Sequence, residues 1–281
     1  TQAQIRELAG QTPVLGITGT SGAGKSSLTD ELVRRFLRDF DDKTVAILSV
    51  DPTRRRTGGA LLGDRIRMNA IDTPRVFMRS LATRDSRSEL SAAIREALDV
   101  LKAAGYDLII VETSGIGQGD AGIIDVCDLS LYVMTSEFGA PTQLEKIDML
   151  DFADLIALNK MEKRGAEDAL RNVRKQYRRN RHLFGAADEE LPVYGTIASQ
   201  FNDGGVNCLF AALMQRVDAK WGNLQPWKVE GLSPLTAPKR AALVPGERVR
   251  YLAEIAQGGR QAHTGSEKAA AAATRAQGVW E

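Results

Sequence analysis

Short apolar runs alternate with longer amphipathic stretches from Pro13 to about Val217. Several of these runs lack polar alternation, which is typical of parallel strands covered on both faces of a sheet. The runs predicted as strands are Val14–Thr18, Val45–Val50, Val76–Met78, Leu108–Val111, Leu129–Thr135, Leu155–Leu158 and Val193–Thr196. The stretches with helical periodicity include Ser26–Asp39, Arg87–Ala104, Pro141–Leu150 and Glu167–Arg181. The pattern predicts an α/β fold with a mostly parallel sheet flanked by helices and joined by right-handed crossovers.

The character of the chain changes after about residue 217. Four prolines and two tryptophans fall between Trp221 and Pro245, which predicts an irregular segment. Gly246–Ala256 is compatible with one helix, and the alanine-rich tail His263–Glu281 with a helix or a linker. We therefore expect one domain at residues 10–217 and a helical or irregular C-terminal extension at residues 218–281.

Composition narrows the functional classes. The 281 residues carry a net charge of +1, so no overall field favours nucleic acid or an anionic membrane as partner. The arginines and lysine of the predicted helix Glu167–Arg181 are interpreted as a solvated face. Two cysteines make no disulfide framework, and no apolar run reaches the roughly 20 residues needed to cross a bilayer. We expect a cytoplasmic protein with neither a nucleic acid nor a membrane as partner.

A complete phosphate-binding motif follows the first predicted strand. The segment Gly19–Ser26 matches G-x-x-x-x-G-K-[ST], and a helical pattern follows it. The glycines let backbone N–H groups surround phosphate oxygens, and the helix N-terminus adds its positive dipole end. Lys25 is predicted to reach the β and γ phosphates, and the Ser26 hydroxyl to bind Mg²⁺. The predicted nucleotide-binding residues of this loop are Gly22, Ala23, Gly24, Lys25, Ser26 and Ser27.

Carboxylates end two further strands and occupy a glycine-rich segment. Glu112 closes the apolar run Leu108–Val111 and is followed by Gly115, whose N–H is placed to meet the γ-phosphate. Asp51 ends another strand, and Asp64 lies in a glycine-rich, charged segment. Both aspartates are predicted either to bind Mg²⁺ or to orient the attacking water, with turn or helix capping as the alternative. Asp51, Asp64, Glu112 and Gln118 all remain eligible to position the water.

A base-reading motif follows the strand Leu155–Leu158. Asn159, Lys160 and Glu162 form N-K-x-E, close to the guanine-reading N-K-x-D. One carboxylate accepts hydrogen bonds from both N1–H and the exocyclic amine of guanine, whereas adenine has neither donor there. The extra methylene of glutamate must be absorbed by a shift of the loop. Ala198 and Ser199, after the last strand, are placed to complete the base pocket through backbone N–H groups.

Taken together, these motifs and the segment Arg56–Met68, which begins Arg-Thr-Gly-Gly, resemble the MeaB/ArgK group of SIMIBI-class GTPases. The resemblance spans roughly residues 10–217, which it identifies as a P-loop GTPase domain. Glu162 and the segment Phe77–Arg84 are most similar to the GTPase domain of fused isobutyryl-CoA mutases. No D-x-H-x-x-G cobalamin signature is present, so we expect an isolated GTPase domain with its linker.

The resemblance implies a function and a set of partners. It implies a chaperone of adenosylcobalamin-dependent acyl-CoA mutases, in which the nucleotide state gates cofactor loading and repair. The partner would be such a mutase with its cobalamin-binding domain, in cis or in trans. The resemblance further implies a homodimer and a signalling loop around Thr135–Lys146. The Mg²⁺ contacts that it implies are Ser26, Asp51, Asp64 and Glu112.

Other classes share the phosphate loop. A small-molecule kinase would need an acceptor pocket with a base, and N-K-x-E disfavours it. A GTPase for nickel insertion usually carries histidine or cysteine metal sites, whereas His182 and His263 are far apart in the sequence. A nucleotide-dependent interaction module with incidental turnover is compatible with the favoured GTPase.

Overall fold

The computed structural model of the chain describes residue 5 and residues 7–52, 68–83, 87–113, 122–139, 144–145, 147–234 and 251–280. The chain divides into two compact units, Thr1–Pro238 and Lys239–Glu281, and each is described by itself. The first unit contains the sheet and every sequence motif of the predicted site.

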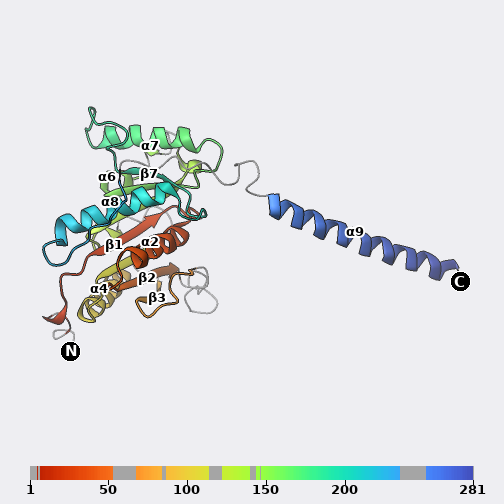
Figure 1. The fold of residues 1–281 in the computed structure, drawn as a ribbon, viewed down its shortest axis with the longest axis horizontal. Helices are drawn as coiled ribbons and strands as arrows, with labels where there is room; N and C mark the ends of the chain where they lie inside the picture. Colours follow the sequence, from red (N-terminus) through yellow and green to blue (C-terminus); the bar gives the residue numbers. More distant parts are fainter. Residues whose placement is uncertain are drawn as a thin grey trace. The chain divides into compact units, whose positions relative to one another are not determined.

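The first unit is built on a seven-stranded parallel sheet in the order β3-β2-β4-β1-β5-β6-β7 (Figure 1). The strands are β1 Val14–Gly19, β2 Val45–Pro52, β3 Val76–Thr83, β4 Leu108–Thr113, β5 Leu129–Thr135, β6 Leu155–Asn159 and β7 Val193–Thr196. From the central β1 the chain builds β2, β3 and β4 on one side and β5, β6 and β7 on the other. In such sheets a ligand crevice forms outside the carboxyl ends of the strands, where the chain changes direction.

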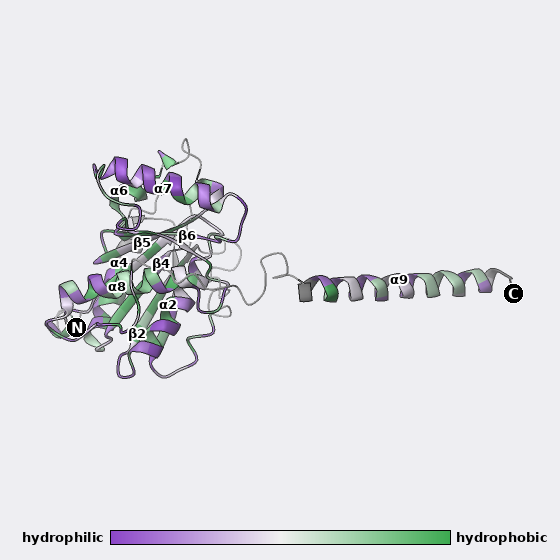
Figure 2. Ribbon diagram, turned by 45° about the horizontal axis from the view of Figure 1, so that its top comes forward, coloured by the Kyte–Doolittle hydropathy of each residue, from purple (hydrophilic) through white to green (hydrophobic). Residues whose placement is uncertain are grey.

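Helices cover both faces of the sheet. The helices are α2 Lys25–Asp39, α4 Arg87–Ala103, α6 Met149–Phe152, α7 Ala166–Asn180 and α8 Gly204–Trp221, and a 3₁₀ turn, η2, spans Ser136–Phe138. α2 and α8 pack side by side on one face, in contact with alternate strand residues such as Leu15 and Ile17 (Figure 1). The opposite strand residues, such as Val14, pack with α4 or with α6 and α7. Apolar side chains thus fill both helix–sheet layers. Helix α7 is largely hydrophilic (Figure 2).

The seven predicted strands and the mostly parallel α/β fold are confirmed, with β3 extending to Thr83. The helix predicted at Pro141–Leu150 is not continuous: Leu144 is helical, Glu145 lies in a turn and α6 begins at Met149. The apolar residues Leu144, Met149 and Leu150 that suggested it are buried against the sheet. Residues 140–143 and 146 lie outside the described part. Helix α8 is buried on most of its sides, so its sequence shows no clear amphipathic stripe.

The segment after α8 packs into the core of the first unit. Trp227 is fully buried, with ring centroids 6.4 Å from Phe36 and 5.7 Å from Phe40. Its backbone N–H donates to Asp218 Oδ1 at 3.1 Å. The core of the first unit therefore includes Trp227, beyond the expected boundary at residue 217; the functional division at that boundary stays a prediction.

The second unit contains one long helix, α9, Tyr251–Trp280, whose residues 254–278 are exposed. The helix predicted at Gly246–Ala256 begins at residue 251 in the described part, and α9 includes most of the alanine-rich tail. None of the helices described, α9 included, combines the length and hydrophobicity that crossing a membrane requires.

Candidate nucleotide site

The phosphate loop lies between the carboxyl end of β1 and the start of α2. Gly22 and Gly24 have φ values of 72° and 88°, in the left-handed region that favours glycine. Gly19 has φ 144°, and a Cβ there would lie 1.8 Å from the Val133 carbonyl oxygen of β5. Three glycines of the motif are therefore required by the backbone itself, before any ligand binds.

Lys25 is held across this loop. Its side chain is buried, and Nζ donates to the carbonyl oxygens of Gly19 and Thr20, each at 3.0 Å. The ammonium group therefore lies above the loop whose N–H groups are expected to bind phosphate. Because it is already oriented there, little rearrangement is needed for it to contact a phosphate oxygen.

Glu112 faces the start of α2. Within β4, Glu112 pairs with Ile17 of β1, and the residue is only 3% exposed. Ser26 Oγ donates to Glu112 Oε1 at 2.6 Å, and Thr29 Oγ1 donates to Glu112 Oε2 at 3.0 Å. Thr29 was not predicted from the sequence; the available signal was a hydroxyl one helical turn beyond Ser26.

The oxygen donors at Ser26 and Glu112 fit Mg²⁺. This ion prefers hydroxyl, carboxylate and water oxygens and is usually held by only one or two protein groups. The two side chains already lie within hydrogen-bond distance, beside the phosphate loop. They suit a small cation that one contacts directly and the other through water.

Four other predicted site residues are only partly described or not described. The backbone of Asp51 belongs to β2, where it pairs with Ala82, while its side chain lies outside the described part. Asp64, Gly115 and Gln118 also lie outside the described residues. Among the residues that are described, no three His, Cys, Asp or Glu side chains gather as a metal site. The roles of these four residues stay predictions.

Asn159 joins the phosphate loop to the segment after β7. The side chain is 2% exposed, and Nδ2 donates to the Ala23 carbonyl oxygen at 2.8 Å. Oδ1 accepts from the Ala198 N–H at 3.1 Å and from Thr196 Oγ1 at 3.2 Å. The buried amide of Asn159 therefore holds the phosphate loop, 136 residues earlier in the chain, next to the segment after β7.

Lys160 adds a second bond to the phosphate loop. It adopts a left-handed backbone conformation with φ 63°, and Nζ donates to the Gly22 carbonyl oxygen at 2.6 Å. The next N–H, of Met161, donates to the Thr196 carbonyl oxygen at 3.1 Å. The N-K-x-E turn is thus tied to both neighbouring loops.

Glu162 and Ser199 lie exposed at the rim of this site, while Ala198 is buried. Next to Glu162, Lys163 Nζ contacts Glu137 Oε1 of η2 at 2.6 Å. The hydrogen bond from Lys163 lowers the pKa of the Glu137 carboxyl. This exposed ion pair connects the base-reading turn to the segment that follows β5.

The basic residues of α7 are partly paired within the domain. Arg174 and Arg178 both contact Asp188, and the Arg181 guanidinium lies 5.4 Å from the centre of the Tyr177 ring. They contribute to packing as well as to a solvated face.

The described parts of the site therefore lie along the carboxyl ends of the neighbouring strands β4, β1, β5, β6 and β7. From β4 towards β7 they are the hydroxyl–carboxylate pair for the metal, the phosphate loop and the base-reading turn. This is the order in which a nucleoside triphosphate presents its metal, phosphates and base.

Residues 2–222 of the chain match the family model described as methylmalonyl-CoA mutase-associated GTPase MeaB. A fused isobutyryl-CoA mutase of Geobacillus kaustophilus is 61% identical over 272 residues, which cover 97% of this chain and 25% of that protein. A fused isobutyryl-CoA mutase of Cupriavidus metallidurans is 57% identical over 256 residues, which cover 91% of this chain and 23% of that protein. The chain spans about a quarter of the length of these relatives.

Two solved structures resemble the fold. A LAO/AO transport system kinase has a TM-score of 0.56 at 22% identity, covering 94% of this chain and 72% of that chain. HypB from Helicobacter pylori in complex with nickel has a TM-score of 0.51 at 14% identity, covering 78% of this chain and 94% of that chain. At these identities the likeness shows the fold alone.

Proposed function

The chain belongs to the MeaB family of methylmalonyl-CoA mutase-associated GTPases, and from this premise we propose a specific function for it. It hydrolyses GTP with Mg²⁺, and its nucleotide state gates cofactor loading and repair in an adenosylcobalamin-dependent acyl-CoA mutase. The nucleotide-binding part of this proposal rests on one observation: the buried amide of Asn159 forms hydrogen bonds to both the phosphate loop and the segment after β7.

Hydrolysis is an in-line attack of water on the γ-phosphate. The protein accelerates it by positioning and by stabilising the charge that develops on the phosphate oxygens. Lys25 and the N–H groups of residues 22–27 supply part of that stabilisation. Ser26 and Glu112 would hold Mg²⁺, which when bound would supply positive charge to the phosphates.

The attacking water is oriented by one of the four candidates Asp51, Asp64, Glu112 and Gln118. Both carboxylate oxygens of Glu112 accept hydrogen bonds from α2, at Ser26 and Thr29. This supports a metal-holding role for Glu112 and leaves the water to one of the other three.

Guanine is selected at the turn after β6. Asn159 and the N–H groups near Ala198 and Ser199 meet the O6 side of the base, and the aliphatic part of Lys160 lies along its ring. Glu162 accepts from N1–H and the exocyclic amine, which adenine does not present. Its exposed position at the rim supports this role, because the longer side chain has room to turn inward.

Turnover of GTP and ATP by the purified chain tests the nucleotide part. We expect Mg²⁺-dependent GTP hydrolysis that falls about a hundredfold or more in Lys25→Ala. In Glu162→Ala we expect the preference for GTP over ATP to drop roughly tenfold or more, because charge-assisted hydrogen bonds to the base are lost. Equal turnover of ATP by the wild-type chain would contradict the guanine assignment and favour the small-molecule kinase.

The proposed partner is an acyl-CoA mutase with its cobalamin-binding domain, in cis or in trans. Support comes from the fused isobutyryl-CoA mutases, which share 57–61% identity with most of this chain.

A route for the signal runs from Glu162 through Lys163 and Glu137 into the segment Thr135–Lys146. Family membership favours this assignment over the nickel-insertion GTPase and the small-molecule kinase. A homodimer is part of the proposal and rests on the family resemblance.

A further inference from the structure

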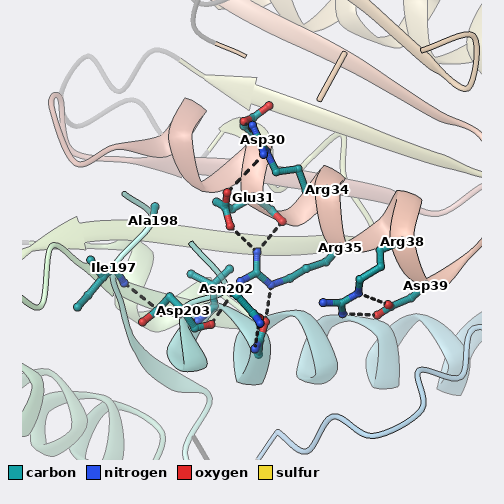
Figure 3. Close-up of polar contacts among 12 residues, drawn as sticks. Asp30, Glu31, Arg34, Arg35, Arg38, Asp39, Ile197, Ala198, Asn202 and Asp203 are labelled. Atoms are coloured by element: carbon teal, nitrogen blue, oxygen red, sulfur yellow. Dashed lines mark hydrogen bonds and ion pairs between the residues drawn. The ribbon is translucent and has the colours of Figure 1, made fainter. Parts of the chain in front are cut away.

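The segment 197–203, between β7 and α8, is held by its own last residue. Asp203 caps α8, where its Oδ2 accepts from the Val206 N–H at 2.8 Å. The same oxygen accepts from the Ile197 N–H at 3.2 Å, so the carboxylate closes the loop on itself (Figure 3). Ile197 precedes Ala198, the residue whose N–H bonds to Asn159. The cap of α8 therefore also determines where the base-pocket backbone lies.

Arg35 of α2 holds the end of this loop. Its side chain is 4% exposed, and Nε donates to Asn207 Oδ1 at 2.7 Å while Nη2 donates to the Asp203 carbonyl oxygen at 3.3 Å (Figure 3). Glu31 Oε2 lies 2.7 Å from Nη1 and balances the buried charge. Asn207 in turn donates to Asn202 Oδ1 at 2.9 Å. A buried charge is costly unless it is paired in this way, so the geometry of the loop is strongly specified.

These contacts complete a closed ring of elements. The phosphate loop bonds to Asn159, Asn159 bonds to Ala198, and the loop of Ala198 bonds through Asp203 to Arg35. Arg35 lies on α2, the helix that the phosphate loop itself starts. The phosphate-binding and base-binding halves of the site are therefore joined directly through Asn159 and Lys160, and also through the polar network of Arg35, Asn207 and Asp203.

We propose that the network of Arg35, Asn207 and Asp203 positions segment 197–203 for guanine, so that these residues set base affinity without touching the nucleotide. The inference rests on the proposed GTPase function and names positioning residues for that same site. A network that only stabilised the packing of α2 against α8 would lower the affinity for every ligand of the site alike. A positioning network acts on the base and leaves the phosphate loop unchanged.

The test compares GDP with pyrophosphate, a ligand of the phosphate loop that has no base, by titration calorimetry of the full chain. Asp203→Ser keeps a good helix cap for Val206 but is too short to hold the Ile197 N–H as well. We expect its Kd for GDP to rise about five- to tenfold, as for the loss of one partly buried hydrogen bond, with the Kd for pyrophosphate changed by less than about twofold. Asp203→Asn retains a side-chain oxygen for both N–H groups and is expected to restore GDP affinity.

A second pair of variants on α2 makes the same comparison. Arg35→Gln removes the buried anchor and is expected to behave like Asp203→Ser. Arg38→Gln removes the same charge from the same helix, but Arg38 is an exposed residue paired with Asp39, so this control is expected to match the wild-type chain (Figure 3). Should Asp203→Ser fail to fold, the comparison of Arg35→Gln with Arg38→Gln decides the question.

The outcomes separate the two proposals. If the wild-type chain prefers GDP to ADP and both network variants keep wild-type GDP affinity, the positioning role is wrong while the GTPase proposal stands. If the affinities for GDP and pyrophosphate fall together, the network is merely structural and the inference is again overturned. If the wild-type chain binds ADP as tightly as GDP, the guanine assignment fails, and the inference fails with it.

Discussion

Gly24 is the residue at which the phosphate loop meets the base-reading motif. It has φ 88°, and a Cβ there would lie 2.6 Å from Asn159 Nδ2, the atom that donates to Ala23. A side chain at this position would therefore strain the backbone and displace Asn159 at the same time. The requirement for glycine comes from the protein's own contacts, in addition to any approach of a phosphate.

We predict that Gly24→Ala lowers GDP affinity tenfold or more. The reason is the loss of one buried hydrogen bond together with about 1–2 kcal/mol of strain from the left-handed backbone. Calorimetry with GDP measures this. Gly105→Ala is the matched control, because Gly105 has φ 80° with no atom within 4 Å of its added Cβ and lies after α4. It should lower the unfolding free energy through strain alone and leave GDP affinity intact; equal GDP affinity in both variants would refute the role assigned to Gly24.

Helix α2 connects the site to the core of the first unit. It begins at Lys25, carries Thr29 and Arg35 on its buried side, and ends at a cluster in which Phe40 packs on Trp227. Lys43 Nζ lies 4.8 Å from the Trp227 ring centre and donates to Gln225 Oε1 at 2.9 Å. The segment after α8 therefore supports the end of the helix that starts at the phosphate loop.

We predict that Trp227→Ala lowers the unfolding free energy by about 3–5 kcal/mol, because it leaves a large cavity against Phe36 and Phe40. Among the described residues, Trp227 Nε1 is buried without a hydrogen-bond partner. Trp227→Phe removes this unsatisfied group and leaves a smaller cavity, so its cost should be clearly lower. Urea denaturation of both variants measures the difference; a wild-type midpoint in Trp227→Ala would show that this segment does not stabilise the first unit.

The chain comprises a GTPase unit and a second unit that contains the exposed helix α9. The chain spans about a quarter of the fused mutases that it resembles, so the proposed signal must leave the GTPase unit for another domain or protein. A nucleotide can act on that partner only if the partner interacts differently with the GTP-bound and GDP-bound states.

We predict that the chain changes the rate of adenosylcobalamin transfer to an isobutyryl-CoA mutase, and that GTP and GDP give different rates because gating requires a differential interaction. The appearance of mutase activity after addition of cofactor measures the transfer. Lys25→Ala should abolish the difference between the nucleotides. Identical rates with GTP, with GDP and without the chain would exclude gating of this mutase.

Most of the fold was predictable because its signals are local. The buried run Leu129–Thr135 and the glycines before Lys25 each depend on neighbours within a few residues, and the structure contains the predicted strands in one parallel sheet. Helix α8 escaped prediction because burial on most sides removes the helical stripe. The prediction of one helix over Pro141–Leu150 missed the turn at Glu145, because the buried residues on either side of it, such as Leu144 and Met149, are apolar in a helix and in a turn alike.

The family, the parallel sheet and the motifs along its carboxyl edge could be inferred from the residues alone, since each motif is a short run with its own chemistry. Two contacts could be seen only in the folded chain: Thr29 joins Ser26 at Glu112, 83 residues away from Thr29, and Arg35 bonds to Asn207 across 172 residues. Such pairs produce no periodic pattern in the sequence, because a polar residue looks the same there whether its side chain faces water or a distant partner. What selects between these states is the packing of one element on another, which exists only once the chain has folded.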